Sequence, residues 1–153
     1  ADRALNASGL AYTVYGVAII ATRLATGRIL DHGSRKGFVI SAFLAMAVGL
    51  IGYAFAASLW LLLVSTVFIA YGCGILHPLL IAVHIERMPE NEKGRASAAF
   101  YLCFDLGIGL GTWLLTPALA WFSLREVFLF AGLVSLAALS LVRSISSHAV
   151  HQQ

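Results

Sequence analysis

The feature that most constrains the fold is the stretch between Lys36 and Glu86, which contains no charged residue. A helix rises about 1.5 Å per residue and needs about 20 residues to cross a bilayer core about 30 Å thick. The stretch is therefore long enough for two membrane crossings. The short segment Ala56-Ala57-Ser58 is small and leans polar, so we expect the turn between the two crossings there.

The uncharged stretch belongs to a pattern of long apolar runs separated by short charged segments. Five runs are present, at about Leu10 to Arg28, Gly37 to Ala57, Leu59 to Ile85, Ala96 to Phe122 and Val127 to Val142. The first four reach or nearly reach the length of a crossing, and the last is slightly short. Only 11% of the residues are charged, against about 25% in a soluble domain. Lipid offers backbone groups no water partners. The sequence therefore predicts an all-α, polytopic transmembrane helix bundle and disfavours a buried soluble core.

The basic residues predict how the helices are oriented. If each run crosses once, two of the ten Lys and Arg residues, Arg3 and Arg125, fall on one side of the membrane. The other eight fall on the opposite side: Arg23, Arg28, Arg35, Lys36, Arg87, Lys93, Arg95 and Arg143. Basic loops stay in the cytoplasm, so we expect the amino end outside and the carboxyl end in the cytoplasm. The net charge of +3 then reflects topology and lipid headgroups, and gives no sign of nucleic-acid binding.

The two ends of the chain and its cysteines give further expectations. The polar segment from Ala1 to Asn6 does not resemble a signal peptide. We expect it to be an extracytoplasmic loop that follows upstream helices. The segment from Ser144 to Gln153 is expected to be a frayed cytoplasmic tail. Cys73 and Cys103 both lie in apolar runs, which favours a packing role over a disulfide or a metal site.

The segment from Gly27 to Lys36 contains the most informative motif. Gly27, Asp31, Arg35 and Lys36 have the spacing of the signature loop of the major facilitator superfamily, and the segment resembles that loop. His32 stands where the family has a basic residue, and Gly33 lies one position before its second glycine. The resemblance implies a latch that favours one of two access states. The alternative is an ordinary basic turn that follows the charge rule.

The resemblance extends over nearly the whole chain. The stretch 12–27 is similar to the eighth helix of bacterial efflux-type members, and 71–78 is similar to their tenth helix. The stretch 89–111 is similar to the loop after the tenth helix and to the eleventh helix. Residues 1–153 would then be a partial C-terminal six-helix half, from the eighth helix to the twelfth. Helices two to six are the competing register. That register is disfavoured because the stretch from Leu59 to Tyr71 lacks the membrane-embedded Arg common in the fourth helix.

Three polar residues are hypothesised to carry function. Asp105 lies ten residues after Arg95, about 15 Å into its helix, where a carboxyl group is costly and could exchange protons or contact a cationic substrate. Its alternative role is a hydrogen bond to a neighbouring helix. His77 precedes Pro78 and could titrate in a polar cavity or bond the carbonyl that the proline frees. Arg23 could close a cytoplasmic gate or extend its side chain to lipid headgroups.

Small and aromatic residues leave more than one interpretation open. Gly107 and Gly111 have the spacing of a close helix contact, and Gly109 extends the same smooth surface. In a transporter such a surface would also let helices slide. Tyr12, Tyr15 and Tyr71 could be interface anchors, core residues or cavity lining.

The family resemblance implies secondary transport of a small molecule by alternating access, with the site between two six-helix halves. It favours a permease of the bacterial inner membrane that acts as a proton-coupled efflux antiporter. The expected partners are the lipid bilayer, the substrate, protons and the missing N-terminal half, and no cofactor, metal or nucleic acid is expected. A non-transporting scaffold, or a truncated fragment that needs a partner half, is the alternative. An enzyme is disfavoured because no carboxylate accompanies His77 and His84 in their run.

Overall fold

The computed structural model describes residues 2–29, 35–86 and 88–150, and the side chains within 9–27, 36–86 and 88–140. The described residues form five α-helices and one short 3-10 turn. They are α1 (Asp2–Ile29), α2 (Arg35–Ala54), α3 (Leu59–Glu86), η1 (Glu90–Glu92), α4 (Lys93–Ala118) and α5 (Leu124–Val150). The prediction of an all-α helix bundle is confirmed.

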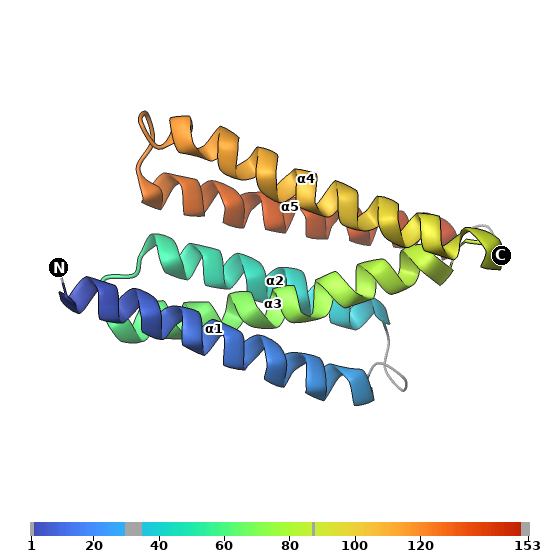
Figure 1. Cartoon of the computed structure of the whole chain (residues 1–153), viewed down its shortest axis with the longest axis horizontal. Helices are drawn as coiled ribbons and strands as arrows, with labels where there is room; N and C mark the ends of the chain where they lie inside the picture. The colour runs from blue at the N-terminus through green and yellow to red at the C-terminus, as the bar shows by residue number, and fades with distance from the viewer. Residues whose placement is uncertain (1, 30–34, 87, 151–153) are drawn as a thin grey trace.

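Successive helices run in alternating directions, so their ends gather at the two ends of the molecule (Figure 1). The start of α1, the α2–α3 turn and the α4–α5 turn lie at one end, and the carboxyl end lies at the other. Helix α2 packs between α3 and α5, and α1 packs against α3. Helix α4 packs against α3 and η1 and against no other described helix. The bundle is therefore a layer of four helices to which α4 is attached along α3.

A glycine lies where helices of the layer approach most closely. A Cβ atom on Gly72 of α3 would lie 2.8 Å from the Ala42 carbonyl oxygen of α2. On Gly74 it would lie 3.0 Å from the Thr22 side chain of α1, and on Gly132 of α5 it would lie 2.9 Å from Ile51 of α2. These distances leave no room for a larger residue, as is typical of membrane helices that pack through small residues.

Four of the helices have the length and apolar composition needed to cross a membrane. These spans, found among the described residues, are Gly9–Gly27, Lys36–Ala54, Leu59–Glu86 and Glu90–Ala118. Helix α5 contains the fifth apolar run, whose crossing remains a prediction. Large apolar side chains are exposed along the bundle, among them Leu24, Trp113 and Phe130. A lipid environment accounts for such exposure, since burial in the bilayer removes these groups from water.

The helix ends differ from the predicted bounds. Helix α1 begins at Asp2, so the expected loop from Ala1 to Asn6 is wrong for residues 2–6. Helix α5 continues to Val150 through most of the expected frayed tail, whose last residues 151–153 lie outside the described residues. Ala, Leu and Arg are strong helix formers. A helix can thus continue where the hydropathy falls, because hydropathy marks the membrane boundary and not the last hydrogen bond.

Two helices also stop earlier than their apolar runs. Helix α2 ends at Ala54 instead of Ala57, and α4 ends at Ala118 instead of Phe122. After α4 the chain tightens into a turn in which the Trp121 amide donates to the Ala118 carbonyl at 3.0 Å. The turn from Ala56 to Ser58 lies where it was predicted, and the Leu61 amide donates to the Ser58 hydroxyl at 3.3 Å. Turn residues can be apolar, so an apolar run overestimates the helix.

Candidate functional site

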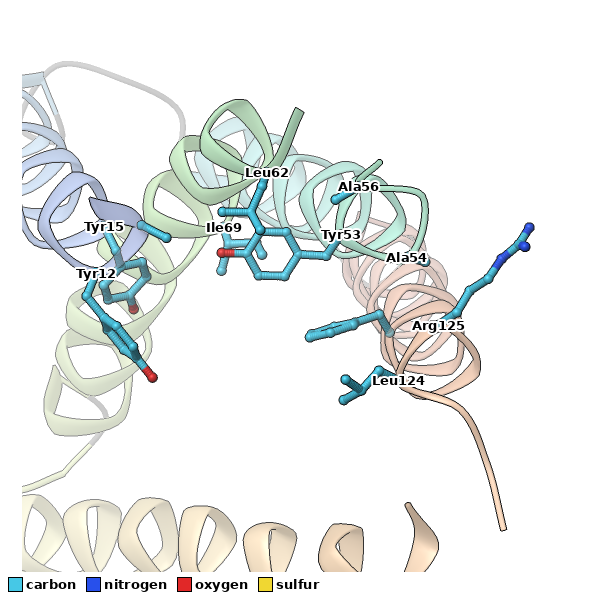
Figure 2. A pocket seen from close by; sticks show the side chains of 11 residues that line it. Tyr12, Tyr15, Tyr53, Ala54, Ala56, Leu62, Ile69, Leu124 and Arg125 are labelled. Carbon is cyan, nitrogen blue, oxygen red and sulfur yellow. The ribbon is translucent and has the colours of Figure 1, made fainter. Parts of the chain in front are cut away.

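An open hollow of about 660 Å³ lies at the end of the bundle that carries the start of α1. Its lining comes from four helices and the α2–α3 turn: Ala11, Tyr12, Tyr15, Tyr53, Ala54, Ala56, Leu62, Ile69, Leu124, Arg125 and Phe128. In Figure 2, Tyr12 and Tyr15 project from α1 toward the space that Tyr53 of α2 enters from the other side. The volume is that of a pocket for a drug-sized molecule. We call it the tyrosine hollow.

The Tyr53 ring is held in place by contacts on both sides. Its hydroxyl lies 2.7 Å from the Thr66 hydroxyl of α3, in a hydrogen bond. Its ring meets Phe128 of α5 edge to face, with centroids 5.2 Å apart. Thr66 is almost fully buried and also donates to the Leu62 carbonyl at 2.8 Å. Tyr53 is therefore a fixed aromatic wall that joins α2, α3 and α5.

The two tyrosines of α1 differ in their surroundings. The Tyr15 hydroxyl lies beside Cys73 of α3, which is half-buried. Tyr12 lies one turn nearer the helix start and is 79% exposed. Within the described part of the chain its hydroxyl has no hydrogen-bond partner. Tyr12 thus presents a free phenol group to the hollow.

Arg125 is the charged residue of the lining, but its guanidinium group points away from the hollow (Figure 2). The Arg125 Cζ atom lies 4.4 Å from the centre of the Phe55 ring, in a cation–π contact between the start of α5 and the α2–α3 turn. This contact holds the cation at the rim. The interior of the hollow is left to aromatic and aliphatic groups.

Glu126, next to Arg125, is turned to a second, apolar hollow of about 440 Å³ between the end of α4 and the start of α5. The Ser123 amide donates to the Glu126 carboxylate at 2.7 Å and the Ser123 hydroxyl donates to it at 3.0 Å. These bonds form a capping box at the start of α5. They hold the pKa of the Glu126 carboxyl below its ordinary value. The Glu126 carboxylate therefore caps the start of α5.

Asp105 is exposed on α4, away from the tyrosine hollow. Among the described residues its carboxyl group has no hydrogen bond or ion pair, so the bond to a neighbouring helix considered above is absent from this part of the chain. The surrounding face of α4 is open as well, because a Cβ atom on Gly107, Gly109 or Gly111 would meet nothing within 4 Å. The close contact expected at Gly107 and Gly111 therefore involves none of the described helices.

His77 lies in the contact between α3 and α4. Its ring packs against Phe104 with centroids 4.6 Å apart, and against Phe100 and Tyr101 at 5.8 and 6.0 Å. His84 extends the cluster to Phe100 at 6.3 Å. His77 does not line either hollow described above. The structure thus places His77 beside Phe104, the neighbour of Asp105 in sequence, and away from the tyrosine hollow.

The signature-loop residues are described only in part. Gly27 is exposed at the end of α1, and Lys36 is exposed at the start of α2. Asp31 lies outside the described residues, and so does the side chain of Arg35, whose backbone begins α2. Arg23 is exposed on α1, two turns after Tyr15. Among the described side chains, no hydrogen bond, ion pair or ring contact joins Arg23 or Lys36 to His77 or Asp105.

Sequence reasoning did not single out Tyr53, Arg125 and Phe128. The signal that could have found them is the alternating topology, which puts the start of α1, the end of α2 and the start of α5 at one end. Aromatic residues near those helix ends are therefore candidates for a common site. No group of three or more His, Cys, Asp or Glu side chains able to hold a metal occurs among residues with described side chains.

Comparisons with known proteins indicate the same family as the resemblance of the segment from Gly27 to Lys36. The family model described as Major Facilitator Superfamily matches residues 3–151. The chain is 29% identical over 133 residues to a multi-drug resistance efflux pump PmrA homolog of Lactococcus lactis. It is 23% identical over 135 residues to the uncharacterized MFS-type transporter YhhS of Escherichia coli K12. These matches cover 86% and 88% of this chain.

The chain spans 33% of the length of each of these relatives. No solved structure matches it. The family match nonetheless covers almost every residue, including all five helices as far as residue 151. The chain therefore belongs to the major facilitator superfamily.

Proposed function

We propose that the chain is part of a secondary transporter that moves a small molecule by alternating access and exports it in exchange for protons. The observation that carries the proposal is the family match over residues 3–151. The relative named as a multi-drug resistance efflux pump homolog supports export. The function is transport and not an enzymatic reaction.

The geometry supports this function in two ways. The tyrosine hollow offers a drug-sized space lined by residues of four helices, and sites between helices are common places for ligands. Asp105 lies on a helix of membrane-spanning length, and its carboxyl group has no partner among the described side chains. Ionisable groups at such a depth are expensive and typically serve ion or proton pathways. Asp105 is proposed as the proton-coupling residue.

The place of the chain in the whole protein is part of the proposal. Residues 1–153 are assigned to the C-terminal half, from the eighth helix to the twelfth, in a bacterial-type inner membrane. The basic residues Lys36, Lys93 and Arg95 lie near helix ends opposite the end with Arg125, which supports a cytoplasmic carboxyl end. A partner half would complete the transport unit, since alternating access needs two moving halves.

The test is transport by the whole protein in liposomes, with an internal pH dye and a panel of drugs, sugars and organic acids. We expect at least one compound to drive proton movement. Asp105→Asn should abolish the proton signal while the protein still folds, and Glu92→Gln, an exposed carboxylate in η1, is the matched control. If no compound moves and no partner half can be found, the scaffold or truncated-fragment interpretation replaces transport.

His77 is tested in the same assay by two replacements. His77→Phe keeps an aromatic ring against Phe104 but cannot bind a proton, whereas His77→Gln keeps polarity and loses the ring. If His77 carries protons, both variants lose coupling. If it serves as a packing contact between α3 and α4, His77→Phe retains coupling and His77→Gln loses it.

A further inference from the structure

We infer that the tyrosine hollow admits an uncharged aromatic compound in preference to a cationic compound of the same shape. The inference rests on the proposed transport function and names the class of substrate that this part of the protein accepts. It is carried by the rings, the charges and the free hydroxyl of the hollow.

Aromatic rings from three helices line the hollow. Tyr12 and Tyr15 lie on α1, Tyr53 on α2 and Phe128 on α5. Tyr53 and Phe128 are already packed edge to face, so they form a preorganised wall. Aromatic pairs gain from stacked and edge-to-face contacts beyond simple burial. A flat aromatic compound between the α1 tyrosines and this wall would make such contacts on both faces.

The charges around the hollow disfavour a cation. No carboxylate lies among its lining residues. The nearest one in sequence, Glu126, lines the second hollow and is bonded to Ser123. The charge at the rim is the Arg125 guanidinium, which repels a cation. Cation–π contacts with the rings would return part of the hydration that a cationic ligand loses, but no counter-charge among the lining residues returns the rest.

The polar groups of the hollow suit a ligand with one hydrogen-bonding group. The Tyr53 hydroxyl is hydrogen-bonded to the Thr66 hydroxyl, and the Tyr15 hydroxyl lies beside half-buried Cys73. Tyr12 has a hydroxyl without a partner in the described part of the chain, and it can donate or accept. A carbonyl or amide on the aromatic compound would bind there. The hollow thus combines an aromatic slot with one polar contact.

The test uses the whole purified protein and two naphthyl compounds of matched size, one an uncharged amide and the other a trimethylammonium cation. Binding is followed by naphthyl emission at low salt, where charge effects are not screened. We expect the amide to bind at least 10-fold more tightly. Tyr15→Ala should weaken amide binding about 3- to 10-fold through the lost stacking. Trp60→Ala, an exposed aromatic at the same end, should leave it unchanged.

A charge reversal separates electrostatics from shape. Arg125→Glu should strengthen binding of the cation about 5-fold or more and leave the amide within 2-fold, whereas Arg95→Glu on α4 should change neither. Equal binding of both compounds to the unmodified protein would overturn the inference, and so would a cation preference. So would indifference of the amide to Tyr15→Ala, which would mean that another part of the protein fills the hollow. If the liposome assay still shows transport, the proposed function stands and only the substrate class is lost.

Discussion

A close backbone approach between α2 and α3 gives a quantitative test of the packing. A methyl group on Gly72 would lie 2.8 Å from the carbonyl oxygen of Ala42, 3.0 Å from the Cβ atom of Met46 and 3.3 Å from the Met46 amide nitrogen. Ala42 is fully buried. Because a carbonyl oxygen of α2 cannot rotate away as a side chain does, Gly72→Ala must move α2 and α3 apart.

The expected change in the free energy of unfolding of Gly72→Ala is the sum of two opposing terms. Overpacking a close contact costs about 1 to 3 kcal/mol, while Ala is a better helix former than Gly by about 1 kcal/mol. Gly109→Ala provides the matched control, since Gly109 is also in a helix interior, is exposed, and has nothing within 4 Å of the place where the added methyl group would lie. The difference between the two variants removes the propensity term, so Gly72→Ala should be less stable than Gly109→Ala by about 1 to 3 kcal/mol.

The assay uses the thiol of Cys73, which is half-buried beside Gly72. In a Cys103→Ser background, a maleimide dye that fluoresces on reaction reports the unfolding of the chain in detergent as temperature rises. A difference of 1 to 3 kcal/mol corresponds to a midpoint lower by roughly 2 to 12 °C for a chain of this size. Equal midpoints for Gly72→Ala and Gly109→Ala would refute the close approach of α2 and α3.

Three further predictions concern a helix cap, a rim contact and an open face. Because the pKa of Glu126 is lowered, its carboxylate stabilises the fold at neutral pH, and this stabilisation is lost as pH falls below about 4.5. Glu126→Gln should therefore lose less thermal stability between pH 7 and pH 3.5 than the unmodified chain. Equal losses in the two proteins would contradict this. Phe55→Leu and Arg125→Gln should show a coupling of about 0.5 to 1 kcal/mol in a double-mutant cycle, and no coupling would exclude a contribution from the cation–π contact. Gly107→Leu should stabilise the isolated chain by up to about 1 kcal/mol through helix propensity but destabilise the whole protein, and destabilisation of the isolated chain would contradict the open face of α4.

The helices could be predicted because membrane crossing imposes a length and excludes charge. The break at Ala56 to Ser58 was located correctly for the same reason, since a long uncharged stretch must turn once. The ends could not be predicted, as the helical residues 2–6 and the early stop at Ala118 show. Hydropathy records where lipid begins, whereas a helix ends where its carbonyls find other partners.

Candidate site residues could be predicted only where a single residue is unusual for its segment. Asp105 stands out in any apolar run because a carboxyl group in lipid is costly. Tyr53 and Phe128 carry no such signal, since aromatic residues in a membrane helix are ordinary. Their role depends on an edge-to-face contact between α2 and α5, two helices that are far apart in the sequence. Gly72 and Gly132 were missed for the same reason, because close contact is a property of pairs.

The separation of Asp105 from the tyrosine hollow constrains how the proposed proton exchange could work. The carboxyl group lies on α4, which contributes no lining residue to the hollow, so a proton and a substrate in the hollow cannot compete for one group. The described link between them is α3, which holds His77 against Phe104 and lines the hollow with Leu62 and Ile69. A ligand shifts an equilibrium only through different affinities for its two states. Within the described chain, coupling between the two places would act through a movement of α4 relative to α3, whose contact includes His77 against Phe104.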